Sequence, residues 1–419
     1  MGPTRADGIG STTDRWLQIA LGIVCMVMVA NLQYGWSLFV NPLDAKFQWG
    51  RADIQFAFTL FILCSTWLMP VAGYLADRYG ARVVTTAGGC FAAIAWTSNA
   101  FADSLTVLYA NAVIGGMGVS AVYGACIGNA LKWFPSQRGL AVGLTAAGFG
   151  TVSAATVLPV HAFIQAHGFE SAFICFGLGQ GAIVVIAAAF IASPRDANFT
   201  SVPVDPQAMR NYGALEILRV PVFWVMYLMF FLAVLAGLMA ISQLAPIAKD
   251  YKVANLPVSI LELTLPALTF ALVLDRIFSG LTRPILGSLS DRLGREHTLC
   301  IAFSIEALAI VGLGQLGHEP VGFVLMTGLI FFGWGAMYSL FPATCADTFG
   351  ARYASTHAGL LFTAKGTAAL VAMLFSATLL PSIDWRLTFY CAAGMNALAA
   401  VMAIWVLMPL RARQLVPAA

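Results

Sequence analysis

Long apolar stretches separated by short polar breaks run along almost the whole chain. An α-helix of about 20 residues is long enough to cross the hydrocarbon core of a membrane. The breaks delimit twelve stretches of about this length, at 16–39, 54–76, 83–101, 105–133, 138–162, 169–193, 222–247, 260–287, 298–316, 320–345, 355–380 and 386–409. The pattern therefore predicts an all-α integral membrane protein with twelve transmembrane helices.

One polar segment is longer than the others, and it separates the first six predicted helices from the last six. We predict an N-terminal half over 1–193, a linker over 194–220 and a C-terminal half over 221–419. The first apolar stretch is too long for a cleaved signal, so we expect it to remain in the mature protein.

Composition agrees with a surface that faces lipid. Of the 419 residues, 60% are hydrophobic and 10% are charged, whereas soluble domains carry about 25% charged residues. The net charge of +3 is too small and dispersed to suggest a nucleic-acid partner. The cysteines form no CxxC pair and no Cys/His cluster with zinc spacing. Since no nucleotide, haem or flavin motif is present either, we expect no metal, no cofactor and no enzymatic activity.

Basic residues predict the orientation in the membrane. If the N-terminus lies in the cytoplasm, 14 of the 22 basic residues fall on the cytoplasmic side and 5 on the other. This asymmetry predicts that both termini are cytoplasmic in a bacterial inner membrane. The remaining basic residues, Arg276, Arg283 and Lys365, lie inside predicted helices.

A short loop motif occurs twice. The sequence GYLADRYG at 73–80 follows the second predicted helix, and GSLSDRLG at 287–294 follows the eighth, 214 residues later. Tyr123 and Tyr338 are separated by a similar 215 residues. A repeat of six helices gives two halves of the same orientation, with a substrate site between them near the membrane midplane.

The charged residues of this loop are candidates for gating: Asp77, Arg78, Asp291 and Arg292. A carboxylate here can cap a neighbouring helix end or pair with its basic loop. Such a contact must break when the halves rock. The alternative is that both loops are simple tight turns with solvated charges.

Five charged residues lie inside predicted helices and away from their ends: Asp275, Arg276, Arg283, Glu306 and Lys365. A charge at the bilayer centre costs about 2.5–3.5 kcal/mol on insertion scales, so such residues are usually functional. If Asp275 pairs with Arg276, then Arg283 and Lys365 are unpaired cations. An arginine fork and a lysine point charge suit the carboxylates of a small anion. Alternatively, Arg283 reaches the lipid headgroups. For Glu306 we expect a structural partner.

Several motifs resemble one family in particular. They are Gln33-Tyr34-Gly35-Trp36, Val122-Tyr123-Gly124, Arg283-Pro284, Trp334-Gly335, Tyr338 and Ala364-Lys365, together with the doubled loop. The chain resembles the oxalate:formate antiporter family of the major facilitator superfamily, which is related to the monocarboxylate transporters. The resemblance implies the major facilitator fold. It also implies that Arg283 and Lys365 bind substrate carboxylates, surrounded by Gln33, Tyr34, Tyr123, Trp334 and Tyr338.

Three positions depart from the family pattern. Phe149 stands where the antiporter has a tyrosine, Phe362 replaces a tryptophan, and Asp275 replaces an asparagine. The first two changes would admit a larger or less polar carboxylate. Asp275 is a candidate proton site, as is an acidic residue near the same arginine in monocarboxylate transporters.

The leading hypothesis is a secondary transporter that exchanges small carboxylates by alternating access. The sequence contains no ATP-binding motif, so the energy is expected to come from solute gradients. The resemblance also implies a monomer, as is usual in this superfamily. A proton-coupled monocarboxylate symporter of the same fold is the alternative. A membrane-embedded sensor is disfavoured because the polar tails are too short for a signalling domain.

Overall fold

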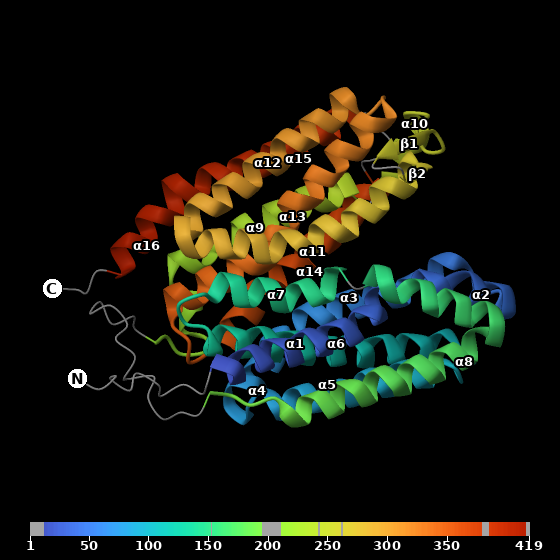
Figure 1. The fold of residues 1–419 in the computed structure, drawn as a ribbon, viewed down its shortest axis with the longest axis horizontal. Coiled ribbons are helices and arrows are strands. Elements are labelled where there is room, and N and C mark those ends of the chain that lie inside the picture. The colour runs from blue at the N-terminus through green and yellow to red at the C-terminus, as the bar shows by residue number, and fades with distance from the viewer. Residues whose placement is uncertain are drawn as a thin grey trace.

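The computed structural model describes residues 12–151, 153–194, 211–241, 244–260, 263–378 and 385–415, nearly all of which are helical. Figure 1 shows two helical bundles side by side, with the start of α1 and α16 at the same end of the molecule. We call this end the terminal end.

The first bundle follows the order expected for the N-terminal half. Its helices are α1 (Thr12–Tyr34), α2 (Ser37–Phe47), α3 (Arg51–Trp67), α4 (Met69–Tyr79), α5 (Ala81–Asn99), α6 (Leu105–Trp133), α7 (Arg138–Thr151) and α8 (Ser153–Phe190). Helices α3 and α4 meet at a bend of 42°. Pro70 lies in the first turn of α4, where a missing N–H costs little but a straight continuation of α3 is disfavoured. Gly168, with φ of 83°, divides α8 into a first part that continues the predicted fifth span from α7 and a second part that corresponds to the predicted sixth span.

The second bundle repeats this arrangement. After the short 3-10 turn η1 (Glu216–Arg219) it contains α9 (Pro221–Ile241), α10 (Leu244–Asp250), β1 (Pro257–Ile260), β2 (Leu263–Pro266), α11 (Ala267–Leu293), α12 (Arg295–Leu316), α13 (Pro320–Phe349), α14 (Ala354–Thr378), α15 (Trp385–Met402), a π-helical turn η3 (Ala403–Leu407) and α16 (Met408–Leu415). Much of the predicted linker lies outside the described residues, so the boundary between the halves stays a prediction.

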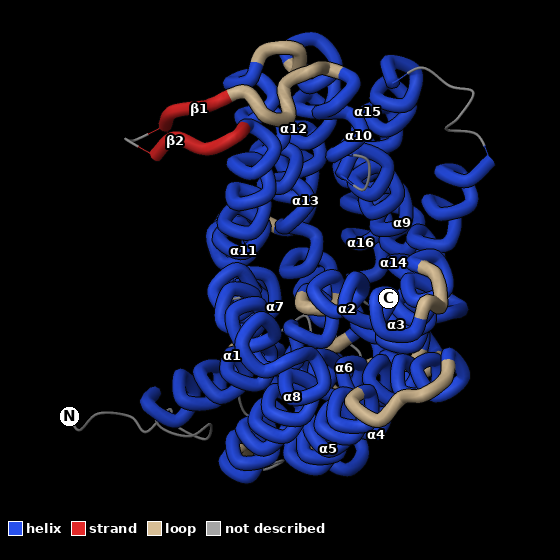
Figure 2. The backbone as a smooth tube through the Cα atoms, turned by 90° about the vertical axis from the view of Figure 1, so that its right-hand side faces the viewer, coloured by secondary structure: helices blue, strands red, loops and turns tan. Residues whose placement is uncertain are grey.

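The predicted start of the eighth helix is wrong. Of the residues that we assigned to its first two turns, Ile260 ends β1 and Leu263–Pro266 form β2, and the two strands pair as an antiparallel hairpin in which Pro257 is opposite Pro266. Helix α11 begins only at Ala267, after Pro266 in an extended conformation. Figure 1 shows the hairpin at the end opposite the terminal end, and Figure 2 shows it at the edge of the second bundle.

The outer surface is apolar, as a lipid environment requires. Phe101, Leu308 and Trp405 are each more than 70% exposed. Among the described residues, eight helices are long and apolar enough to cross a membrane, or nine if α3 and α4 form one bent span. Helix α11 is not among these eight, and it carries Asp275, Arg276 and Arg283.

Candidate substrate site between the two halves

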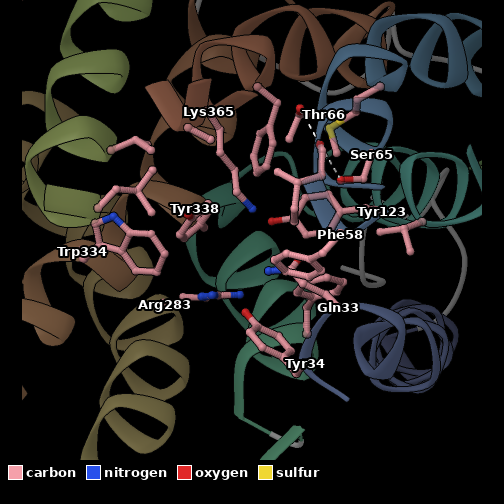
Figure 3. Close-up of a pocket in the computed structure, with 18 residues that line it drawn as sticks. Gln33, Tyr34, Phe58, Ser65, Thr66, Tyr123, Arg283, Trp334, Tyr338 and Lys365 are labelled. Atoms are coloured by element: carbon pink, nitrogen blue, oxygen red, sulfur yellow. Dashed lines mark hydrogen bonds between the residues drawn. The ribbon is translucent and has the colours of Figure 1, made fainter. Parts of the chain in front are cut away.

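A cavity of about 230 Å³ lies between the bundles (Figure 3). Its walls come from α1, α3, α4, α6 and α7 of the first bundle and from α9, α11, α13 and α14 of the second. All nine predicted substrate residues line it: Gln33, Tyr34, Tyr123, Phe149, Arg283, Trp334, Tyr338, Phe362 and Lys365. The structure therefore brings together residues that are more than 300 positions apart in the sequence.

Arg283 is held between the two bundles. Its guanidinium donates a hydrogen bond from Nη1 to the carbonyl oxygen of Ala146 in α7, and a longer one of 3.4 Å from Nη2 to Ser279 Oγ. The guanidinium carbon lies 4.8 Å from the ring centre of Tyr338, and Nε has no hydrogen-bond partner in the part of the chain that the structure describes. Arg283 is only 2% exposed. The alternative in which it reaches the lipid headgroups is therefore wrong.

The close contact of α7 with α11 depends on glycine. A methyl group on Gly143 would collide with the backbone of Arg283, and one on Gly150 would lie 3.0 Å from its guanidinium carbon. Small residues let helix backbones approach closely inside a membrane. The glycines of α7 thus make room for Arg283 at this interface.

Lys365 is the second cation of the cavity. Its Nζ lies 5.3 Å from the ring centre of Tyr338 and 5.9 Å from that of Phe362. Within the described residues no acidic side chain pairs with Lys365 or with Arg283. Aromatic faces attract cations, but the attraction is weaker than an ion pair. Both cations are therefore available to an anion.

Aromatic rings form a continuous wall around these cations. Tyr34 and Tyr123 contact Phe149 with ring centres 5.7 and 5.5 Å apart, and Tyr123 lies 5.0 Å from Phe362. Tyr338 continues the wall, since it lies 5.8 Å from the ring of Phe362. The hydroxyl groups of Tyr123 and Tyr338 are buried and have no hydrogen-bond partner among the residues that the structure describes, so they too can bind a polar ligand.

Some residues of the cavity wall were not predicted. They include Phe58, Ser65 and Thr66 of α3. The hydroxyls of Ser65 and Thr66 both donate to the carbonyl oxygen of Ile62, as is common for such side chains in membrane helices. These residues carry no charge and belong to no repeat, so the sequence offers no reason to single them out.

Asp275 lies outside the cavity wall. Its carboxylate is 3.4 Å from Nε of Arg276, the pairing that leaves Arg283 and Lys365 without an acidic partner. The guanidinium of Arg276 in turn lies 4.4 Å from the ring centre of Tyr34 in the first bundle. The role of Asp275 as a proton site stays a prediction.

The residues of the doubled motif that were predicted as loops form the last turns of α4 and α11 instead. At the terminal end, the carboxylates of Asp77 and Asp291 in these turns each cap a helix of the opposite bundle. Asp77 accepts hydrogen bonds from the backbone N–H and the hydroxyl of Thr356, at 2.8 and 2.7 Å. Asp291 accepts from the backbone N–H groups of Gly139 and Leu140, both at 2.9 Å. The first N–H groups of a helix have no partner within it, and the helix dipole favours a negative charge there. The two contacts are equivalent under the internal repeat.

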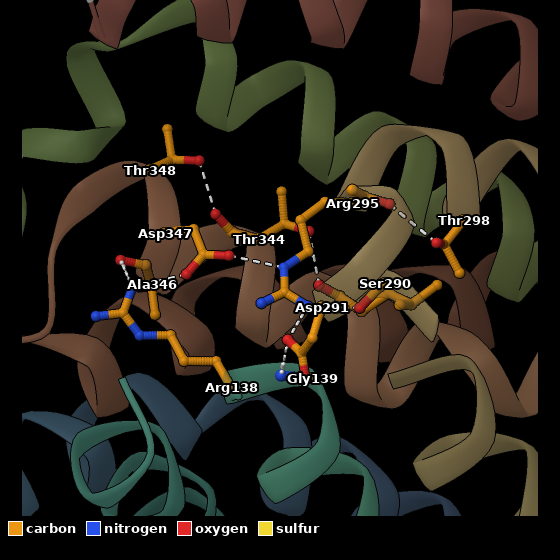
Figure 4. Close-up of polar contacts among 12 residues, drawn as sticks. Arg138, Gly139, Ser290, Asp291, Arg295, Thr298, Thr344, Ala346, Asp347 and Thr348 are labelled. Carbon is orange, nitrogen blue, oxygen red and sulfur yellow. Dashed lines mark hydrogen bonds and ion pairs between the residues drawn. The ribbon is translucent and has the colours of Figure 1, made fainter. Parts of the chain in front are cut away.

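Further ion pairs connect these caps. Arg138 of α7 lies 2.7 Å from Asp347 of α13, and Arg295 lies 2.7 Å from both Asp291 and Asp347 (Figure 4). Lys132 pairs with Asp77 at 2.8 Å. The motif alone did not reveal these partners. The internal repeat could have pointed to two of these residues, because Lys132 and Asp347 are 215 positions apart, as are Tyr123 and Tyr338.

The arginines of the doubled loop lie apart from these contacts. Arg78 and Arg292 are both exposed. The guanidinium of Arg78 lies 5.5 Å from the ring centre of its neighbour Tyr79. Their predicted part in gating stays a prediction, whereas Asp77 and Asp291 do join the two bundles.

Comparison with known proteins identifies the family. The family model of the Major Facilitator Superfamily matches residues 19–281 and 258–418. The chain belongs to this superfamily. It is therefore a multi-pass membrane transporter and not an enzyme, as the sequence predicts.

Relatives in the superfamily agree with the resemblance noted above. The oxalate:formate antiporter of Oxalobacter formigenes is 31% identical over 411 residues, which are 97% of this chain and 94% of the antiporter. Monocarboxylate transporter 3 of Rattus norvegicus is 29% identical over 182 residues, 42% of this chain and 36% of that protein. The structure of the proton:xylose symporter XylE covers 95% of this chain and 97% of its own, with a TM-score of 0.70 and 10% identity. This last match shows the fold alone, and it confirms the predicted major facilitator fold.

Proposed function

We propose that this protein is a secondary transporter that exchanges small carboxylate anions, of the oxalate and formate type, across a bacterial inner membrane. The observation that carries the proposal is the pair of cations, Arg283 and Lys365, in one buried cavity without an acidic partner among the described residues. The similarity to the oxalate:formate antiporter over nearly the whole chain supports the same substrate class.

The two cations favour a dicarboxylate over a single carboxylate. Arg283 can offer N–H groups to one carboxylate in a fork, and Lys365 can place a point charge on the other. The hydroxyls of Tyr123 and Tyr338 can donate to the remaining oxygens. A monocarboxylate neutralises one cation and leaves the other buried without a counter-ion, which is costly.

The same charges favour exchange over net transport. Alternating access requires the halves to rock around the site. An empty site would have to reorient with two uncompensated cations, whereas a bound anion removes most of that cost. Proton symport through Asp275 is less well supported, because Asp275 pairs with Arg276 outside the cavity wall. We further propose that both termini are cytoplasmic and that the protein acts as a monomer.

The test uses purified protein in liposomes that contain oxalate, with labelled oxalate outside. We expect uptake that requires internal oxalate or formate and is insensitive to a pH gradient. Uptake into empty liposomes that an uncoupler abolishes would instead establish proton symport. Absence of binding and transport for oxalate, formate and lactate would overturn the carboxylate assignment.

A further inference from the structure

Glu306 of α12 lies inside the second bundle, where none of its surface is exposed. We expected a structural partner for it, but no hydrogen bond or ion pair reaches either carboxyl oxygen from the described residues. An ionised carboxylate in such a place costs several kcal/mol. Buried acids without a counter-ion usually avoid this cost by keeping their proton.

Other polar groups near Glu306 are also without partners. The side-chain amide of Asn396 on α15 lies close enough to interact with the carboxyl group, yet neither its nitrogen nor its oxygen has a hydrogen-bond partner within the described ranges. Nε1 of Trp334 on α13 is also buried and has no partner among the described residues. Buried polar groups in folded proteins nearly always have partners, so these neighbours are expected to satisfy one another.

Counting donors and acceptors favours the neutral acid. The amide oxygen of Asn396 needs a donor, and Trp334 Nε1 can only donate. An ionised Glu306 could accept from Trp334 and from the amide nitrogen, but it has no hydrogen for the amide oxygen. A protonated Glu306 can donate its O–H to the amide oxygen of Asn396, while its carbonyl oxygen accepts from the amide nitrogen of Asn396 and from Trp334 Nε1. This form leaves no group of the cluster unsatisfied.

Two glycines make room for this cluster. A methyl group on Gly237 of α9 would lie 2.5 Å from Trp334 Nε1 and 3.2 Å from Glu306 Oε1, so the two atoms face the same small space. A methyl group on Gly333 would lie 2.6 Å from Glu306 Cβ. In Figure 3 the indole nitrogen of Trp334 is turned away from the cavity that its ring lines. Glu306 therefore lies behind one wall of the substrate cavity.

No charge on the surrounding helices offsets a negative Glu306. The charged residues of the helices packed against α12 are Asp275, Arg276, Arg283, Asp291 and Arg292 of α11, Asp347 of α13 and Arg386 of α15. Within the described residues none forms an ion pair with Glu306. Tyr338 of α13 is the titratable group that interacts with it electrostatically.

We propose that Glu306 is a positioning residue that keeps its proton throughout transport, bridges Trp334 to Asn396, and thereby fixes the Trp334 wall that limits substrate size. Only its transport consequence rests on the proposed carboxylate function. The protonation of Glu306 can be measured without any substrate.

The first experiment is infrared difference spectroscopy of the wild-type protein and Glu306→Gln in lipid. We expect the wild type to show the carbonyl stretch of a protonated carboxylic acid, and the variant to lack it. Glu319→Gln, which removes an exposed glutamate, is the matched control and should keep the band. A wild-type spectrum without a band that depends on Glu306 would overturn the proposal, whatever the transported substrate is.

The second experiment compares the exchange kinetics of three proteins. Glu306→Gln should keep the KM for oxalate and the pH profile of the wild type. Glu306→Leu should raise that KM about fivefold, the effect of one neutral hydrogen bond, and should relax the preference for oxalate over larger dicarboxylates. A KM in Glu306→Gln as high as in Glu306→Leu, or a changed pH profile, would show that the ionised form is needed and would overturn the proposal. If Glu306→Leu does not fold, Asn396→Leu replaces it with the same expected rise.

Discussion

The central cavity and the terminal end both contain buried charges, but the charges are arranged in opposite ways. At the terminal end, Arg138 and Arg295 have carboxylate partners within 2.7 Å. In the cavity, Arg283 and Lys365 have none among the described residues. Buried charges that are paired within the protein stabilise the conformation in which the pair forms. Unpaired buried charges are costly, and a bound ligand of opposite charge removes that cost. Buried charges therefore hold the two halves together at the terminal end, whereas in the cavity they are available to bind an anion.

The largest expected effect comes from removing one cavity cation. Lys365→Ala should weaken oxalate binding about 100-fold, because a charged hydrogen bond and the counter-charge of one carboxylate are lost together. Binding of formate should fall much less. Isothermal titration calorimetry measures the Kd for oxalate and for formate. The control is Lys249→Ala, which removes an exposed lysine of α10. Equal losses for oxalate and formate would contradict the two-cation site.

A smaller effect is expected from weakening a cap at the terminal end. Asp291→Asn removes the charge that faces the N-terminus of α7, and should shift the equilibrium about tenfold away from the conformation closed at this end. Spin labels at positions 79 and 293, where Tyr79 and Leu293 are exposed, report the separation of the halves. Oxalate binding at equilibrium should change little. A distance distribution like that of the wild type would count against a gating role.

The ion pair across the halves should show a measurable coupling energy. A double-mutant cycle of Arg138→Ala and Asp347→Ala, followed by thermal unfolding, should give about 1–2 kcal/mol. The exposed pair Lys46–Glu170, at 2.8 Å, lies within one half and should give less than about 1 kcal/mol. Similar values for both pairs would show that burial between the halves adds nothing.

The aromatic wall offers a finer change. Phe149→Tyr adds a hydroxyl next to Tyr34 and Tyr123, and one new hydrogen bond should favour oxalate over a less polar dicarboxylate about fivefold. Competition of unlabelled anions against labelled oxalate measures this preference. An unchanged ranking of the anions would mean that the ring of residue 149 does not face the bound substrate.

The smallest effect is expected at Asp275. Asp275→Asn should leave the pH dependence of exchange unchanged, because the exchange mechanism needs no titrating group. Exchange rates measured across a range of pH test this. If the substitution removes a pH dependence that the wild type shows, Asp275 is the proton site and the symport alternative is favoured.

Much of the cavity was predictable because charges inside membrane helices are rare. Arg283 and Lys365 stood out on that ground, and the family resemblance added the aromatic residues around them. The hairpin β1–β2 was missed because strand β2 directly precedes α11, so that its residues read as the start of the same apolar stretch. Ion-pair partners such as Asp347 were missed because helices far apart in the sequence are brought together only by packing, and the packing determines which charged residues meet.

Where the bundles meet near the terminal end, backbone touches backbone. Methyl groups on Gly139 or Gly143 of α7 would collide with the backbone of α11, and methyl groups on Gly73 of α4 or Gly359 of α14 would collide with the backbone of the facing helix. Most helix pairs interlock through ridges of side chains, which must climb over one another before the helices can shift. The contacts of α7 with α11 and of α4 with α14 lack such ridges at these glycines. The two contacts are equivalent under the internal repeat. At both of them, one half can tilt against the other without rearranging the side chains of its core.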